Sequence, residues 1–197
     1  AGPTGAIAAF VNAHVIAMAD VMLDFHSGGT ATEYVDCGFL CMGPDTEMNA
    51  ANLALAGVFG APYTMVCPID GTGGDFDTAA YRQKTRFLSC ELGGLGRFSP
   101  ASFQTGWAAT RRVLSHLGLI VGDIAAPQTQ FIDITARSRF ATVAYHGLAQ
   151  LFVSPGDAVR QGDPVATVFD IHNFGEVRQN LFAEQDGMVA ICRRNPL

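Results

Sequence analysis

The sequence has few charged residues and no long basic run. Charged residues make up 15% of the 197-residue chain, with 12 Lys and Arg against 18 Asp and Glu and a net charge of −6. Nucleic acids and anionic membrane surfaces attract basic patches, so neither is an expected partner. The apolar runs fall well short of the roughly 18 residues of a membrane span. With no signal-peptide pattern at the N-terminus, we expect a soluble, cytoplasmic protein.

Cysteine is also too sparse for a disulfide framework. The chain has five cysteines, at positions 37, 41, 67, 90 and 192. An odd number, set mostly in apolar runs, predicts reduced and buried thiols. Cys37 and Cys41 have a spacing that some zinc sites use, but no second pair follows nearby. We therefore expect no metal at that pair.

Helical and extended patterns alternate over residues 1–122. The predicted helices cover residues 4–18, 48–59 and 99–118. The predicted strands cover residues 21–26, 63–67 and 86–92. A polar loop is expected at 27–45 and a glycine-rich loop at 70–77. This alternation predicts an α/β domain, with part of a mixed, mostly parallel sheet and helices on both faces.

The composition changes at a Pro-containing linker, Gly122–Gln130. Helical periodicity is absent beyond it, and short strand-like runs alternate with Gly/Pro turns. The runs are at residues 131–135, 141–144, 151–153, 158–168 and 186–192. We therefore predict a small all-β module over residues 131–197.

The most informative segment is Val21–Gly29, in which a strand ends in Asp24-Phe25-His26 and breaks into Ser27-Gly28-Gly29. Catalytic and ligand-binding groups in open α/β sheets gather beyond the carboxyl ends of strands. His26 is therefore a candidate metal ligand or general base. Strand alternation places Asp24 on the same face, where it could support the imidazole as a hydrogen-bond partner. The alternative is a structural histidine at a strand end.

Glu91 ends a second strand in the same way, within Cys90-Glu91-Leu92-Gly93-Gly94. A carboxylate in an apolar strand is costly, and burial would raise its pKa toward the range of a general base. The alternative is a structural ion pair with a neighbouring cation: Arg82, Lys84, Arg86 or Arg97. The same four cations are candidates for binding a substrate carboxylate, and the sequence does not select one of them.

Taken together, Asp24–Gly29 and Cys90–Gly96 resemble the succinylglutamate desuccinylase/aspartoacylase family of zinc amidohydrolases. The resemblance is nearest to the N-acetyl-diaminobutanoate deacetylase type. Three further segments support it: Gly2-Pro3-Thr4, Phe59–Tyr63 and Phe76–Ala80. It therefore extends over most of residues 2–120. A C-terminal β module is also a feature of this family.

The resemblance implies a site and a reaction. His26 matches a zinc ligand of the family, and Glu91 matches its catalytic glutamate. Zn2+ would activate a water molecule, Glu91 would accept its proton, and the water would attack the amide carbonyl of a small N-acyl amino acid. The products would be a carboxylate and an amine.

One part of the family pattern is missing from the sequence. The other two zinc ligands of the family form an H-x-x-E pair, and this chain contains no H-x-x-E. We therefore expect a fragment of a longer enzyme, with the β module also incomplete at its C-terminus. We expect the fragment alone to be inactive and to bind no stoichiometric zinc. A homo-oligomer is possible, because an incomplete sheet exposes an edge.

The β module has its own resemblance, to half of a biotinyl/lipoyl-like barrel. Ser154–Val159 and Gln161–Ala166 carry it. Such carriers attach their cofactor to a lysine, and no lysine follows Lys84, so a swinging-arm role is excluded.

Two other functions can be weighed against the hydrolase. One is a non-catalytic binding or assembly module, in which His26 and Glu91 are structural. The other takes Cys90 as a nucleophile. Strand alternation puts Cys90 on the face opposite Glu91, and apolar surroundings favour an inert thiol.

Overall fold

The computed structural model describes residues 2–69, 75–122, 124–173 and 175–194. The described chain divides into two compact units, each considered by itself. Unit 1 comprises residues 1–26, 36–91 and 100–136, and unit 2 comprises 27–35, 92–99 and 137–197. Among the described residues, no helix combines the length and apolar character that a membrane span requires.

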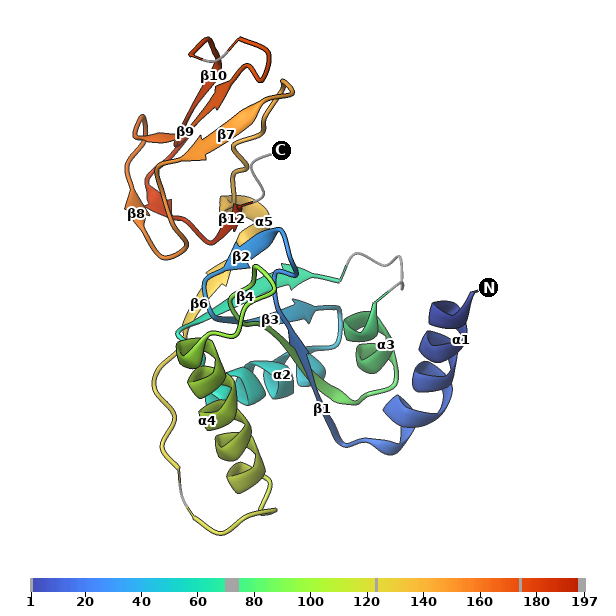
Figure 1. The fold of residues 1–197 in the computed structure, drawn as a ribbon. Coiled ribbons are helices and arrows are strands. Elements are labelled where there is room, and N and C mark those ends of the chain that lie inside the picture. Colours follow the sequence, from blue (N-terminus) through green and yellow to red (C-terminus); the bar gives the residue numbers. More distant parts are fainter. Residues whose placement is uncertain (1, 70–74, 123, 174, 195–197) are drawn as a thin grey trace. The chain divides into compact units, whose positions relative to one another are not determined.

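Unit 1 is built on a five-stranded sheet with the order β1-β5-β3-β4-β6 (Figure 1). The strands are β1 (Val21–His26), β3 (Cys37–Met42), β4 (Tyr63–Pro68), β5 (Arg86–Glu91) and β6 (Gln130–Asp133). The pairs β1/β5, β3/β4 and β4/β6 are parallel, and β3/β5 is antiparallel. The prediction of a mixed, mostly parallel sheet is therefore confirmed.

Helices cover both faces of this sheet. The helices of unit 1 are α1 (Pro3–Phe10), η1 (Val11–Val15), η2 (Ile16–Met18), α2 (Thr46–Phe59), α3 (Phe76–Arg82), α4 (Pro100–His116) and α5 (Ile134–Arg137). On one face, Phe25 of β1 packs against Phe59 of α2, with ring centroids 6.3 Å apart. On the other face, Phe87 of β5 forms a buried cluster with Ile16 and Ala80. Because Phe25 and His26 are consecutive in a strand, His26 shares the second face, with α3.

Capping residues explain where two of these helices begin. The side chain of Asp45 accepts hydrogen bonds from the backbone N–H groups of Glu47 and Met48 at the start of α2. Asp75 accepts one from Thr78 at the start of α3. Both satisfy N–H groups that a helix leaves without partners in its first turn. Thr4 does not cap α1, which begins one residue earlier at Pro3 after Gly2.

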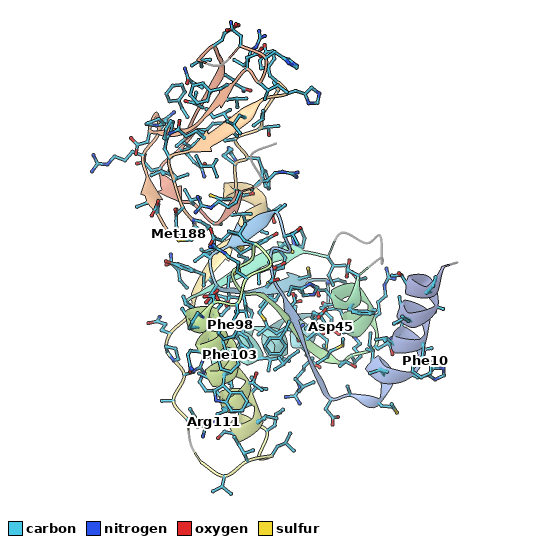
Figure 2. All side chains as sticks on the ribbon, viewed as in Figure 1. Phe10, Asp45, Phe98, Phe103, Arg111 and Met188 are labelled. Atoms are coloured by element: carbon cyan, nitrogen blue, oxygen red, sulfur yellow. The ribbon has the colours of Figure 1, made fainter. Side chains whose placement is uncertain are left out.

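The first predicted helix differs from expectation beyond its first residue. It passes through a π-helical turn and a 3-10 turn and buries Ile16. Ile7, Phe10 and Met18 remain largely exposed, and Phe10 (labelled in Figure 2) has 61% of its surface accessible. A helix was predicted here, but the predicted apolar stripe (Ile7, Phe10, Val11, Val15 and Met18) does not include Ile16, the residue that is buried.

The predicted loop at 27–45 was wrong, since it contains the short strand β2 (Thr32–Tyr34) and the central strand β3. β3 reads Cys-Gly-Phe-Leu-Cys-Met, and a strand covered on both faces lacks the alternating pattern that marks a half-exposed one. The glycine-rich loop predicted at 70–77 lies mostly outside the described residues. Its last part, from Phe76, begins α3.

Unit 2 consists of short antiparallel strands: β2, β7 (Leu148–Leu151), β8 (Ala158–Val159), β9 (Pro164–Phe169), β10 (Val177–Phe182), β11 (Gly187–Met188) and β12 (Ile191–Arg193). They form a β10-β9-β7 sheet and the pairs β11-β8 and β12-β2. The Nε of Arg194 contacts Glu33 Oε2 at 2.9 Å, which ties the last described residue to β2. The likeness to a biotinyl/lipoyl barrel stays a prediction.

The strands of the predicted β module differ from the structure at three segments. Residues 131–135 do not form a strand of that module, because β6 pairs with β4 in unit 1 and passes into α5. Residues 141–144 form no strand: the side-chain amide of Gln179 accepts from Ala144 N–H and donates to the Thr142 carbonyl. β10 was missed, because Val177–Phe182 has little alternation.

Arg112 of α4 fixes the end of α2 from inside the fold. Only 8% exposed, it donates from Nε to the Phe59 carbonyl at 3.0 Å and from Nη2 to the Gly60 carbonyl at 3.3 Å. Carbonyl groups at a helix end lack partners within the helix. Arg112 therefore supplies hydrogen bonds that the end of α2 needs.

We expect Arg112→Met to lower the free energy of unfolding by roughly 1–3 kcal/mol, because buried carbonyls lose their donors while the aliphatic part of the side chain is retained. Urea denaturation measures the change. Arg111→Met, on the exposed neighbour labelled in Figure 2, is the matched control and should shift stability by less than about 0.5 kcal/mol. Equal losses in the two variants would contradict this role of Arg112.

Candidate active site

His26 and Glu91 are partners across the β1/β5 pair. The register of the two parallel strands places His26 directly beside Glu91, and Asp24 beside Ser89. Directly paired residues of neighbouring strands point to the same face of a sheet. The two residues that the sequence singled out at the ends of strands therefore lie at adjacent strand ends. Their catalytic and metal-binding roles remain predictions.

Asp24 holds the imidazole of His26. Its Oδ2 lies 2.8 Å from His26 Nε2, the contact expected of a supporting carboxylate. Burial opposes the charged imidazolium, but the hydrogen bond to Asp24 and the charges of Asp24, Glu91 and Asp77 outweigh it and raise the pKa of His26. The contact engages Nε2, so Nδ1 is the ring nitrogen that Asp24 does not contact.

Glu91 is half-buried and carries an unsatisfied oxygen. Oε2 is inaccessible to solvent and has no hydrogen-bond partner within the described residues. Burial raises the pKa of Glu91, which the charge of Asp24 reinforces and that of His26 opposes. A buried acceptor without a donor carries a free-energy penalty that a bound ligand or water would remove.

The alternative of a structural ion pair for Glu91 gains no support from three of its four candidate partners. Lys84 contacts Asp45 instead. The Nη2 atom of Arg97 lies 3.8 Å from Glu33, and Arg86 donates from Nε to the Asp20 carbonyl. None of these three contacts involves Glu91.

Asp77 is a member of this face that the sequence did not single out. It stands in the first turn of α3, where its Oδ2 accepts a hydrogen bond from the Cys41 thiol at 3.3 Å. Burial raises the pKa of Asp77 to about 6, and its charge interacts with those of Asp24 and His26. Phe76-Asp77-Thr78 was noticed as part of a family resemblance. Its position against the sheet depends on tertiary packing, which the sequence pattern does not reveal.

Cys90 does not belong to this face. It is 2% exposed and is the register partner of Phe25, on the side covered by α2. Burial raises the pKa of the Cys90 thiol to about 12. Thiols act as nucleophiles in their deprotonated form, so the structure agrees with the interpretation of Cys90 as an inert core residue.

The donor set fits one metal ligand and its support. An imidazole held by a carboxylate is the usual environment of a ligating histidine, and Glu91 is the register partner of this histidine on the neighbouring strand. Structural and catalytic zinc sites use three or four protein ligands. Among the described residues, no three His, Cys, Asp or Glu side chains are grouped to hold a metal.

The family follows from comparison with known proteins. Residues 3–117 match the succinylglutamate desuccinylase/aspartoacylase catalytic domain. This match covers more than half of the chain, which therefore belongs to that family of deacylases.

Similarity to individual proteins narrows the comparison within this family. The chain is 34% identical over 196 residues to the N-alpha-acetyl-L-2,4-diaminobutyric acid deacetylase of Halomonas elongata, covering 98% of this chain and 57% of the relative. It superposes on the product-bound ectoine utilization protein EutE (DoeB) of Ruegeria pomeroyi with a TM-score of 0.92 at 27% identity, covering 99% of this chain and 60% of that structure. A succinylglutamate desuccinylase/aspartoacylase from Rhodobacter sphaeroides shares the fold, with a TM-score of 0.87 at 23% identity over 97% and 58% of the two chains.

We expect Asp24→Asn to lower the pKa of His26, because the variant removes the negative charge that favours the imidazolium and replaces one carboxylate oxygen with an amide group that cannot accept a hydrogen bond. NMR titration of the imidazole resonances measures it, with the other histidines as internal references. Asp20→Asn, an exposed carboxylate at the entrance to β1, is the control and should leave that pKa unchanged. An unaltered His26 pKa in Asp24→Asn would show that the contact has no electrostatic effect.

Proposed function

We propose that this chain carries part of the active site of a zinc-dependent amidohydrolase that removes the acyl group of a small N-acyl amino acid. One observation supports this most strongly: His26, held by Asp24, lies beside a half-buried Glu91 with an unsatisfied oxygen. Membership of a deacylase family favours the same chemistry. The alternative of a non-catalytic assembly module is not favoured by any of these features.

In this proposal each residue has one task. His26 is a zinc ligand through Nδ1, and Asp24 fixes the orientation of its ring through Nε2. Bound Zn2+ would supply Lewis acidity, which lowers the pKa of water and polarises the acyl carbonyl. Glu91 accepts the proton of the attacking water and returns it to the leaving amine. Its raised pKa suits both steps, because a carboxylate that is too acidic is a weak base.

The substrate class follows from the relatives. The Halomonas elongata protein is named for deacetylation of N-alpha-acetyl-L-2,4-diaminobutyric acid, and we propose an N-acetyl amino acid or a closely similar amide here. The chain spans 57% of that relative, so the activity proposed is that of the whole protein. A cytoplasmic location and a homo-oligomer remain predictions.

We expect Glu91→Gln to reduce kcat by about 10²–10⁴-fold, the usual contribution of a general base, with zinc content unchanged. The assay uses the full-length product of the gene and follows amine release from N-acetyl-2,4-diaminobutyrate. Glu47→Gln, an exposed glutamate in the first turn of α2, is the matched control and should retain wild-type activity. A Glu91→Gln enzyme with wild-type kcat would exclude the proposed base.

Measurements of zinc affinity distinguish the proposed ligand, His26, from the residue that orients it, Asp24. In the same full-length product, we expect Asp24→Asn to weaken zinc binding by about 10–100-fold, and His26→Ala to weaken it further. Competition with a chromophoric chelator measures both values, and His116→Ala on α4 is the control. The 197-residue chain alone should bind no stoichiometric zinc, because one histidine is a weak site. Undiminished affinity in His26→Ala would rule out this ligand.

A further inference from the structure

Two thiols face each other on the central strands of unit 1. Cys41 of β3 and Cys67 of β4 are register partners in the parallel pair. Their Sγ atoms lie 3.1 Å apart, within hydrogen-bonding distance for sulfur. The two cysteines have no role in the proposed hydrolysis, and they are not members of the core cluster around Ile16.

The pair is connected to a carboxylate and a carbonyl. The Cys41 thiol donates to Asp77 Oδ2 at 3.3 Å, and the Cys67 thiol has two acceptors within reach, the Cys41 sulfur at 3.1 Å and the Leu40 carbonyl at 3.8 Å. Asp77 is thus placed to accept a proton from Cys41. Because the pKa of Asp77 is about 6, its carboxylate is ionised in neutral and alkaline solution.

The backbone also permits a covalent link. Neighbouring strands lie about 4.8 Å apart, and disulfides join Cα atoms roughly 4.4–6.8 Å apart. The two sulfurs therefore need to close by only about 1 Å to reach the length of a disulfide bond, about 2.05 Å.

We propose that Cys41 and Cys67 form a site of reversible oxidation, at which a hydroperoxide converts the two thiols into a disulfide. Cys41 transfers its proton to Asp77, and its sulfur attacks the peroxide, whose O–O bond breaks as a sulfenic acid forms. The sulfur of Cys67 then attacks the Cys41 sulfur, forming the S–S bond and breaking the S–O bond. Two electrons pass to the peroxide, the two thiol protons pass to its oxygens, and the oxygens leave as water or alcohol.

The raised pKa of Cys41 slows the first step of this reaction, whereas the short distance between the two sulfurs speeds the second. The hydrogen bond with Cys67, together with burial and the charge of Asp77, raises the pKa of Cys41, so its thiolate is rare at neutral pH. The first step is therefore slow and accelerates with pH. The second step is fast, because the resolving sulfur is already in contact. A sulfenic acid formed at Cys41 is thus captured before it oxidises further.

Oxidation has a consequence for the neighbouring carboxylate. A disulfide removes the thiol proton that Cys41 donates to Asp77. Burial raises the pKa of Asp77, and this hydrogen bond, together with the charge of His26, lowers it. Asp77 would therefore be more readily protonated in the oxidised chain. Since its charge helps to raise the pKa of His26, the thiol pair is electrostatically connected to the candidate active site.

The chain contains its own reference thiols. Cys37, Cys90 and Cys192 are buried, and burial raises the pKa of Cys37 and Cys90 to about 12. Cys37 shares the face of its register partner Glu91, whereas Cys90 points to the opposite face. Because these three thiols are buried, an oxidation that is specific to Cys41 and Cys67 should leave them reduced.

The test is treatment of the purified chain with hydrogen peroxide at pH 8, followed by thiol titration in denaturant and peptide mapping. We expect two of the five thiols to be lost and restored by dithiothreitol, with a loss of two hydrogen atoms in the intact mass. The map should contain a Cys41–Cys67 crosslink. Mapping needs no variant, so the test does not depend on a substitution that impairs folding, and it requires neither zinc nor deacylase activity.

Variants identify the two steps. Cys67→Ser should form no disulfide and should accumulate a Cys41 sulfenic acid that dimedone traps, and Cys41→Ser should form neither product. Cys192→Ser, the control, should oxidise like the wild type. Reduced Cys41 and Cys67 after other thiols have reacted, a crosslink to another cysteine, or irreversible sulfinic acid as the main product would each overturn the proposal.

Discussion

The parallel register of β1 on β5 is the constraint on which the candidate site depends. It pairs His26 with Glu91 and keeps Asp24 two residues behind on the same face. A shift by one residue would turn Glu91 toward α2 and bring Cys90 beside His26. The apolar residues fix this register, because Met22 and Phe87 must face the cluster around Ile16 while Phe25 meets Phe59. Core packing and site geometry are thus set by the same alternation.

The electrostatics of this face follow from its composition. Asp24, Asp77 and Glu91 are acidic, and His26 is the basic group whose charge they share. Burial raises the pKa of Glu91 and Asp77, and mutual repulsion adds to it. Such an excess of negative charge is unfavourable for a face without a ligand, and favourable for one that receives a cation. The proposed metal chemistry therefore accounts for an arrangement that is costly in the isolated chain.

The sequence predicted those parts of the fold that depend on local pattern. The helix predicted over residues 99–118 and the acid–histidine end of β1 both lie within short segments. The strand β3, which runs antiparallel to β5, was missed, because a central strand covered on both faces looks like any apolar run. Missing β3 also hid the position of Cys41, since its partners Cys67 and Asp77 are 26 and 36 residues away. The roles of His26 and Glu91 came from a family resemblance, and their adjacency depended on strand pairing.

Asp77 connects the two chemistries of this face. Its carboxylate accepts from the Cys41 thiol on one side, and its charge acts on His26 on the other. A group with a pKa near 6 changes charge within the range of ordinary solution conditions, so either a proton or the loss of the thiol donor can alter it. Because His26 responds to that charge, the ionisation of the site depends on the state of a residue in α3 as well as on Asp24. The position of α3 against β3 and β5 therefore influences the pKa of His26, although α3 supplies none of the residues proposed for catalysis.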